Sequence, residues 1–124
     1  MILWVNGPLT EPESLALYNF TLFHNFRLMI TYHTQGKEIY YEFQSYAPQE
    51  AENIGKLFSR VSGYTLATPE YNSSFAGYKD WFIQDYRRPG YTIEAGLGTN
   101  PLPISQFNEI YNNNLKILIL GAII

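Results

Sequence analysis

The sequence contains no cysteine among its 124 residues. This absence excludes disulfide bonds and metal sites built on thiolates, and it leaves the redox compartment open. Charged residues are also scarce, at 15%, and the formal net charge is −3. Basic residues gather nowhere except at Arg87 and Arg88. Because a nucleic-acid site needs a basic patch, we expect no nucleic-acid partner.

Long hydrophobic runs are missing as well. The apolar run from Leu115 to Ile124 includes Lys116 and has about half the length of a membrane span. We interpret it as a buried helix end and expect no membrane partner. The stretch Met1–Gly7 is too short and too uncharged for a signal peptide. A chain of 124 residues predicts a single domain, residues 1–124, that is small for a complete α/β enzyme.

Aromatic residues, in contrast, are abundant at 17%, with 11 tyrosines and 8 phenylalanines. Tyrosines in such number usually line a polar groove as well as a core. Helix and strand signals alternate along the chain. This alternation predicts an α/β fold with a parallel or mixed sheet and helices on both faces.

Four helices are predicted. The first has Thr10 as its N-cap in a capping box with Glu13, runs to about His24, and should bury one face. The second follows Pro48 and ends at Ser62-Gly63, the third covers 77–86, and the fourth covers 104–121. The expected core face of the first helix comprises Leu15, Leu17, Tyr18, Thr21 and Leu22, and that of the fourth comprises Ile104, Phe107, Ile110, Tyr111, Leu115 and Leu118.

Two predicted strands end on chemically active side chains. Residues 26–32 lead into His33, and the β-prone run from Tyr91 ends on Glu94, before Gly96 and Gly98. Ligands bind outside the carboxyl ends of strands in α/β sheets. If the two strands are parallel neighbours, His33 and Glu94 face one cleft, with the polar and aromatic segment 37–43 beside them. Residues 64–68 form a further candidate strand.

The residue types leave alternatives open. His33 is a metal ligand, a general base or a hydrogen-bonded residue at a strand end. An acid such as Glu94 after a buried strand must hydrogen-bond to water or to a partner group. One function of such an acid is to act as the general base for a metal-bound water. His24 has a structural or solvated role. By residue type alone, Tyr71 is an ordinary surface or core tyrosine, and Lys79 is an ordinary exposed lysine.

Four short motifs occur in an order that resembles a known family. They are Thr10-Glu11-Pro12-Glu13, Tyr32-His33-Thr34-Gln35-Gly36, Tyr78-Lys79-Asp80-Trp81-Phe82 and Thr92-Ile93-Glu94-Ala95-Gly96. Together they resemble the C-terminal part of a zinc carboxypeptidase catalytic domain of the carboxypeptidase A/T type. The similar branch is that of the bacterial γ-D-glutamyl-meso-diaminopimelate peptidases (γ-D-glutamyl-L-diamino acid endopeptidases). The resemblance implies a partial three-layer α/β/α sandwich.

The resemblance also implies roles for individual residues. His33 matches a zinc ligand, Glu94 the general base, and Tyr71 a mobile tyrosine that closes over the substrate. Lys79 matches the floor of the specificity pocket, where a cation implies an acidic, peptidoglycan-derived peptide as substrate. The implied cofactor of the complete domain is Zn²⁺, and the implied setting is the cell wall or spore of a bacterium, or secretion from it.

The chain departs from the family in one respect. No histidine is followed three residues later by glutamate, whereas the family has a His-x-x-Glu pair of zinc ligands upstream of the matching segment. A catalytic zinc site needs three protein ligands. We therefore expect the isolated chain to be inactive, to bind zinc below stoichiometry, and to expose apolar surface and sheet edges, which a homodimer would cover. The alternative is a non-catalytic peptide-binding or assembly module derived from this fold.

Overall fold

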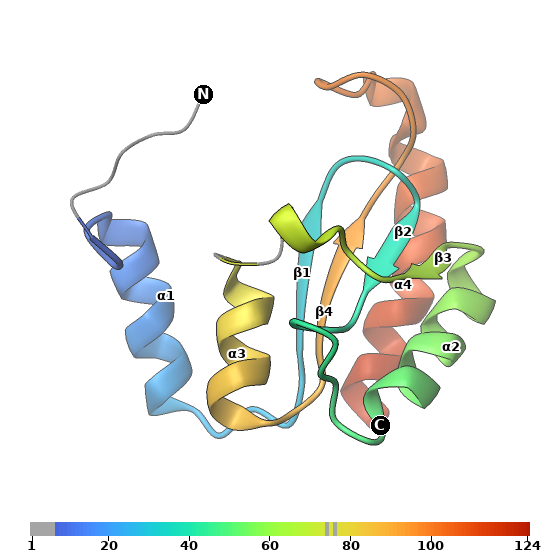
Figure 1. Ribbon diagram of the computed structural model, residues 1–124. Coiled ribbons are helices and arrows are strands. Elements are labelled where there is room, and N and C mark those ends of the chain that lie inside the picture. Colours follow the sequence, from blue (N-terminus) through green and yellow to red (C-terminus); the bar gives the residue numbers. More distant parts are fainter. Residues whose placement is uncertain (1–6, 74, 76) are drawn as a thin grey trace.

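The computed structural model describes residues 7–73, 75 and 77–124, and a mixed sheet forms the centre of this part (Figure 1). Its strands are β1 (Met29–His33), β2 (Glu38–Tyr40), β3 (Thr65–Ala67) and β4 (Gly90–Glu94), in the spatial order β1-β4-β2-β3. Strand β4 is parallel to β1 and antiparallel to β2, and β2 is parallel to β3. The predicted α/β class and mixed sheet are confirmed, and β1 includes His33 as its last residue.

The described part of the chain contains four α-helices: α1 (Pro12–Phe23), α2 (Ala51–Ser62), α3 (Tyr78–Tyr86) and α4 (Phe107–Ile123). Figure 1 shows α1 and α3 on one side of the sheet and α2 and α4 on the other. Short 3₁₀ turns, Tyr71–Ser73 and Ile104–Gln106, precede α3 and α4. The prediction of helices on both faces is therefore confirmed. None of the described helices has the length and apolar character needed to cross a membrane.

The ends of two helices test the local sequence signals. Helix α2 ends as predicted, because Gly63 takes the left-handed conformation at φ 76° and donates its N–H to the Ser59 carbonyl over 2.8 Å. The predicted capping box at Thr10 is wrong. The N-cap of α1 is Glu11, whose side chain makes no capping hydrogen bond, and the Thr10 hydroxyl donates to the Gly7 carbonyl over 3.3 Å.

The predicted core faces of the first and last helices are mostly wrong, although Thr21 is buried and Ile110 packs against the core. In α1 the only buried residue is Thr21, whereas Leu15, Leu17 and Leu22 are exposed. In α4 the buried residues are Asn114 and Ile117, and most of the predicted stripe is exposed. The apolar C-terminal run is likewise not a buried end, since Ile123 is 75% exposed. Both helices thus present apolar side chains that no described element covers.

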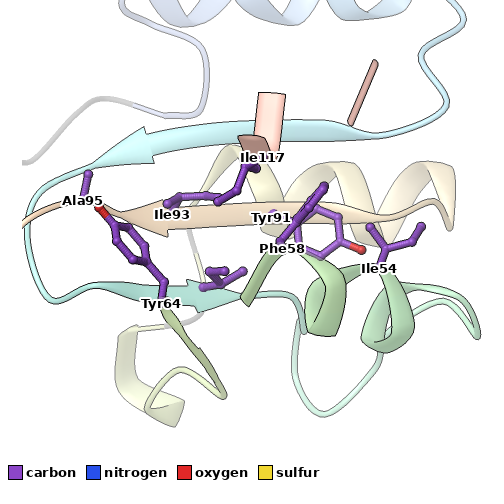
Figure 2. Close-up of a cluster of buried hydrophobic side chains, with 8 residues drawn as sticks. Ile54, Phe58, Tyr64, Tyr91, Ile93, Ala95 and Ile117 are labelled. Atoms are coloured by element: carbon purple, nitrogen blue, oxygen red, sulfur yellow. The ribbon is translucent and has the colours of Figure 1, made fainter. Parts of the chain in front are cut away.

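The core lies between the sheet and the helices α2 and α4 (Figure 2). Strand β4 supplies Tyr91 and Ile93, which are fully buried, and the Tyr91 hydroxyl donates to the Ala51 carbonyl over 2.8 Å. The other buried members are Ile39, Ile54, Phe58, Tyr64, Ala95 and Ile117. Because side chains alternate along a strand, Thr92 and Glu94 point to the opposite face.

Truncation of Ile93 should therefore weaken the fold strongly. We expect Ile93→Ala to lower the free energy of unfolding by about 2–5 kcal/mol, through lost burial and a cavity. The matched control is Ile123→Ala, where the side chain is 75% exposed and the expected change is within about 0.5 kcal/mol. Urea denaturation followed by circular dichroism measures both. Equal effects of the two substitutions would contradict the assigned core.

Candidate functional site

The carboxyl ends of β1 and β4 bring His33 and Glu94 together. The two strands are parallel neighbours, and His33 and Glu94 occupy the same register position. Glu38 of β2 pairs with Glu94 from the other side. Strand β4 therefore places one carboxylate between a histidine and a second carboxylate.

These residues line a cleft of about 650 Å³. Its floor is the face of the sheet opposite the core, and its walls are the loop after β3 and the start of α3. The residues that line it are His33, Glu38, Tyr40, Ala67, Thr68, Pro69, Glu70, Gly77, Lys79, Asp80, Thr92 and Glu94. The cleft expected from the two strand ends is thus present, and it includes two residues of the segment 37–43.

Glu94 has an electrostatic environment suited to proton transfer. Burial raises the pKa of its carboxyl group above the ordinary value, the His33 imidazole lowers this pKa, and the neighbouring Glu38 raises it. A carboxylate with a raised pKa is a stronger base than an exposed one. The position of Glu94 in the cleft gives it access to a bound ligand.

Glu38 and Tyr40 were not singled out from the sequence. The Tyr40 hydroxyl donates a hydrogen bond to Glu38 Oε2. This bond is the main reason that the pKa of Tyr40 is raised to about 12, with burial as the second cause. The signal that could have found them is their two-residue spacing, which places both side chains on one face of a strand.

Lys79 and Asp80 form a buried ion pair at the start of α3, with side chains only 6% and 8% exposed. The Lys79 ammonium donates to Asp80 Oδ1 and to the Glu42 carbonyl. Asp80 Oδ2 accepts the Gly77 N–H over 3.1 Å. The expectation of an ordinary exposed lysine is wrong, because the pair anchors Lys79 in the cleft wall. An ammonium has three donors, so two partners leave one donor for a ligand.

Tyr71 is not among the residues that line the cleft. It lies in the 3₁₀ turn before α3, it is 72% exposed, and its ring packs edge-on against Phe75 at 5.0 Å between centroids. Its closure over a substrate therefore stays a prediction. His24 follows α1, with Nδ1 2.8 Å from the Phe20 carbonyl oxygen and its ring stacked on Phe26. These contacts agree with the structural role expected for His24.

The described part of the chain does not by itself fit a zinc ion. It contains no group of three histidine, cysteine, aspartate or glutamate side chains arranged to hold a metal. A catalytic zinc site needs three protein ligands and an open position. His33 is the one zinc ligand that the resemblance assigns to this chain.

Two bacterial proteins are similar to the chain in sequence. It is 50% identical over 115 residues to γ-D-glutamyl-L-diamino acid endopeptidase 1 of Lysinibacillus sphaericus, a match that covers 93% of the chain and 28% of that protein. It is 42% identical over 112 residues to the uncharacterized protein YqgT of Bacillus subtilis strain 168, over 90% of the chain and 30% of that protein. The chain thus spans less than a third of either relative. No family model matches it.

Solved structures show the fold. Carboxypeptidase A from Helicoverpa armigera matches 95% of the chain with 35% of its own length, at a TM-score of 0.75 and 17% identity. Bovine thrombin-activatable fibrinolysis inhibitor, solved with tick carboxypeptidase inhibitor, matches 94% of the chain with 46% of its own, at a TM-score of 0.69 and 18% identity. The four helices and the mixed sheet correspond to part of the carboxypeptidase fold. The resemblance read from the four motifs is confirmed.

The Lys79–Asp80 pair can be tested by a double-mutant cycle. Lys79→Met leaves a buried carboxylate without its cation, and Asp80→Asn leaves a buried ammonium without its anion, so each should cost about 3–5 kcal/mol of stability. The double variant should cost less than the sum, with a coupling energy of about 0.5–3 kcal/mol. Urea denaturation of the four proteins measures the coupling. Strict additivity would mean that the two side chains do not interact.

Proposed function

We propose that the chain forms part of the catalytic domain of a zinc metallopeptidase that hydrolyses γ-D-glutamyl-diaminopimelate bonds in peptidoglycan-derived peptides. The observation that carries the proposal is the His33–Glu94 pair, held in one register position at the carboxyl ends of two parallel strands and facing a cleft. The 50% identity to a γ-D-glutamyl-L-diamino acid endopeptidase over 93% of the chain supports the choice of substrate.

In this proposal Glu94 is the proton-transfer group. Its carboxylate accepts a proton from the attacking water and passes it to the leaving amine. The raised pKa supports this role, because a half-buried carboxylate is a better proton acceptor than an exposed one. His33 supplies one metal ligand, and the others come from residues outside this chain. The chain alone is therefore inactive and binds zinc below stoichiometry.

Lys79 binds a carboxylate of the substrate in this proposal. Its ammonium is fixed by Asp80 and the Glu42 carbonyl and keeps one donor for a ligand. The other charged residues that line the cleft are mainly acidic: Glu38, Glu70, Asp80 and Glu94. An acidic peptide is thus attracted by Lys79 alone and not by the net charge of the cleft.

The role of Glu94 can be tested in a chimera. The matching segment of the Lysinibacillus sphaericus endopeptidase is replaced by this chain, and hydrolysis of a γ-D-glutamyl-diaminopimelate peptide is followed by chromatography. Glu94→Gln should lower kcat by about 10²–10⁴-fold, because general acid–base catalysis contributes that much. Bound zinc, measured by elemental analysis, should be unchanged.

The matched control for Glu94→Gln is Glu52→Gln. Glu52 lies on the exposed side of α2 and forms a surface ion pair with Lys56 over 2.7 Å, which is worth about 0.3–0.5 kcal/mol. Its loss should leave kcat unchanged. Near-normal turnover of the Glu94→Gln chimera would overturn the catalytic assignment.

The role of Lys79 can be tested on the chain itself by nuclear magnetic resonance. Titration with a γ-D-glutamyl-diaminopimelate peptide should shift the resonances of residues 77–80 in a saturable manner. A peptide in which lysine replaces diaminopimelate lacks the carboxylate at the end of that side chain and should bind about tenfold more weakly, a difference of about 1.4 kcal/mol. Equal affinity for the two peptides, or no saturable shift, would contradict the assignment of Lys79.

A further inference from the structure

Main-chain hydrogen bonds continue between the segments that follow β1 and β4. The Ala95 N–H donates to the His33 carbonyl over 2.8 Å, and the Gly36 N–H donates to the Gly96 carbonyl over 2.8 Å. The two segments therefore run side by side beyond the ends of their strands. Because loops move more than the strands they follow, the positions of the side chains at the strand ends depend on the contacts that hold these segments.

A reciprocal pair of side-chain hydrogen bonds joins the same two segments. The Thr34 hydroxyl donates to Asn100 Oδ1 over 2.8 Å, and Asn100 Nδ2 donates to the Thr34 carbonyl over 3.2 Å. A carboxamide carries both a donor and an acceptor, so it can bond the hydroxyl and the carbonyl of one residue at once. Thr34 directly follows His33. The bonds of Asn100 thus hold the chain immediately after the histidine.

The loop that carries Asn100 is itself fixed next to α4. Gln106, directly before α4, accepts the Leu97 N–H over 3.1 Å at Oε1 and donates from Nε2 to the Leu97 carbonyl over 2.7 Å. Gly96 takes φ 78°, and a Cβ atom there would come within 2.5 Å of Leu102 Cδ1. Only glycine accepts this close, left-handed turn without strain. Asn100 therefore connects the end of β1 to an anchored loop.

We infer that Asn100 is a positioning residue of the proposed active site, which holds the chain after His33 against the loop after Glu94. This inference rests on the proposed function, because it concerns the same site. Neither Thr34 nor Asn100 is among the described residues that line the cleft, so Asn100 acts through its neighbours and not on a ligand. His33 and Glu94 share one register position. A shift of about 1 Å in a reacting group can lower a rate about 10²-fold.

The first test measures kcat and KM of variants in the chimera with the Lysinibacillus sphaericus endopeptidase. Asn100→Ala removes both bonds and should lower kcat about tenfold while KM changes less than about twofold. Thr34→Val removes the hydroxyl and should also lower kcat. Thr34→Ser keeps the hydroxyl and should retain kcat within about twofold of the unaltered chimera.

The matched control is Glu50→Ala, which also removes two exposed side-chain hydrogen bonds. Arg27 donates both of them to the Glu50 carboxylate, over 3.2 and 3.0 Å. Urea denaturation should show a small loss of stability in Glu50→Ala, comparable with that in Asn100→Ala, but its kcat should be unchanged. A normal kcat in Asn100→Ala, or an equal loss of kcat in Glu50→Ala, would overturn the inference.

Hydrogen exchange in the chain itself tests the positioning without turnover. The Gly36 and Ala95 amides bond across the two segments, so their exchange should become about fivefold faster or more in Asn100→Ala and stay unchanged in Glu50→Ala. Unchanged exchange in Asn100→Ala would overturn the inference. If the unaltered chimera hydrolyses no γ-D-glutamyl-diaminopimelate peptide, the proposed function falls, and faster exchange in Asn100→Ala still supports the positioning of the two strand ends.

Discussion

The alternation of side chains along β4 is the constraint on which the rest of the structure depends. Tyr91 and Ile93 point into the core, and Thr92 and Glu94 point into the cleft. A slip of one residue in register would bury Glu94 and expose Ile93, so hydrophobic burial fixes the position of the carboxylate. The same strand pairs with β1 and with β2, and this shared pairing sets His33 and Glu38 on the two sides of Glu94.

The wall of the cleft at α3 contains a buried ion pair, which costs free energy of folding. Burial of an ion pair rarely adds stability over apolar packing, because desolvation offsets the attraction. The Lys79–Asp80 pair persists because the Glu42 carbonyl and the Gly77 N–H satisfy further donors and acceptors. A Cβ atom at Gly77 would lie 2.9 Å from Asp80 Oδ2, so a side chain there would displace the paired carboxylate. An arrangement of this kind holds one ammonium in a fixed position in the cleft wall.

Local signals predicted the strands and the helix ends better than the helix faces. The β-branched and aromatic run before Glu94 predicts a strand, and the glycine after α2 predicts a helix C-terminus. Each signal favours one local structure. The last turns of α4, however, are apolar on every side, because they contain Leu115, Ile117, Leu118 and Ile119. The periodicity of apolar residues therefore cannot predict which face of α4 is buried. The buried face carries Ile117 and Asn114, and Asn114 donates to the Tyr64 hydroxyl over 3.0 Å. The burial of Lys79 depends in the same way on the distant Glu42 carbonyl and lies beyond sequence patterns.

Three separate features of the described chain lie together. The main-chain groups of Ile30 and Tyr32 pair with no described strand, α1 and α4 expose apolar side chains, and His33 belongs to no group of three possible metal-holding side chains among the described residues. All three lie at or beside β1. An unpaired edge strand flanked by exposed apolar side chains is the arrangement with which a sheet accepts a further strand.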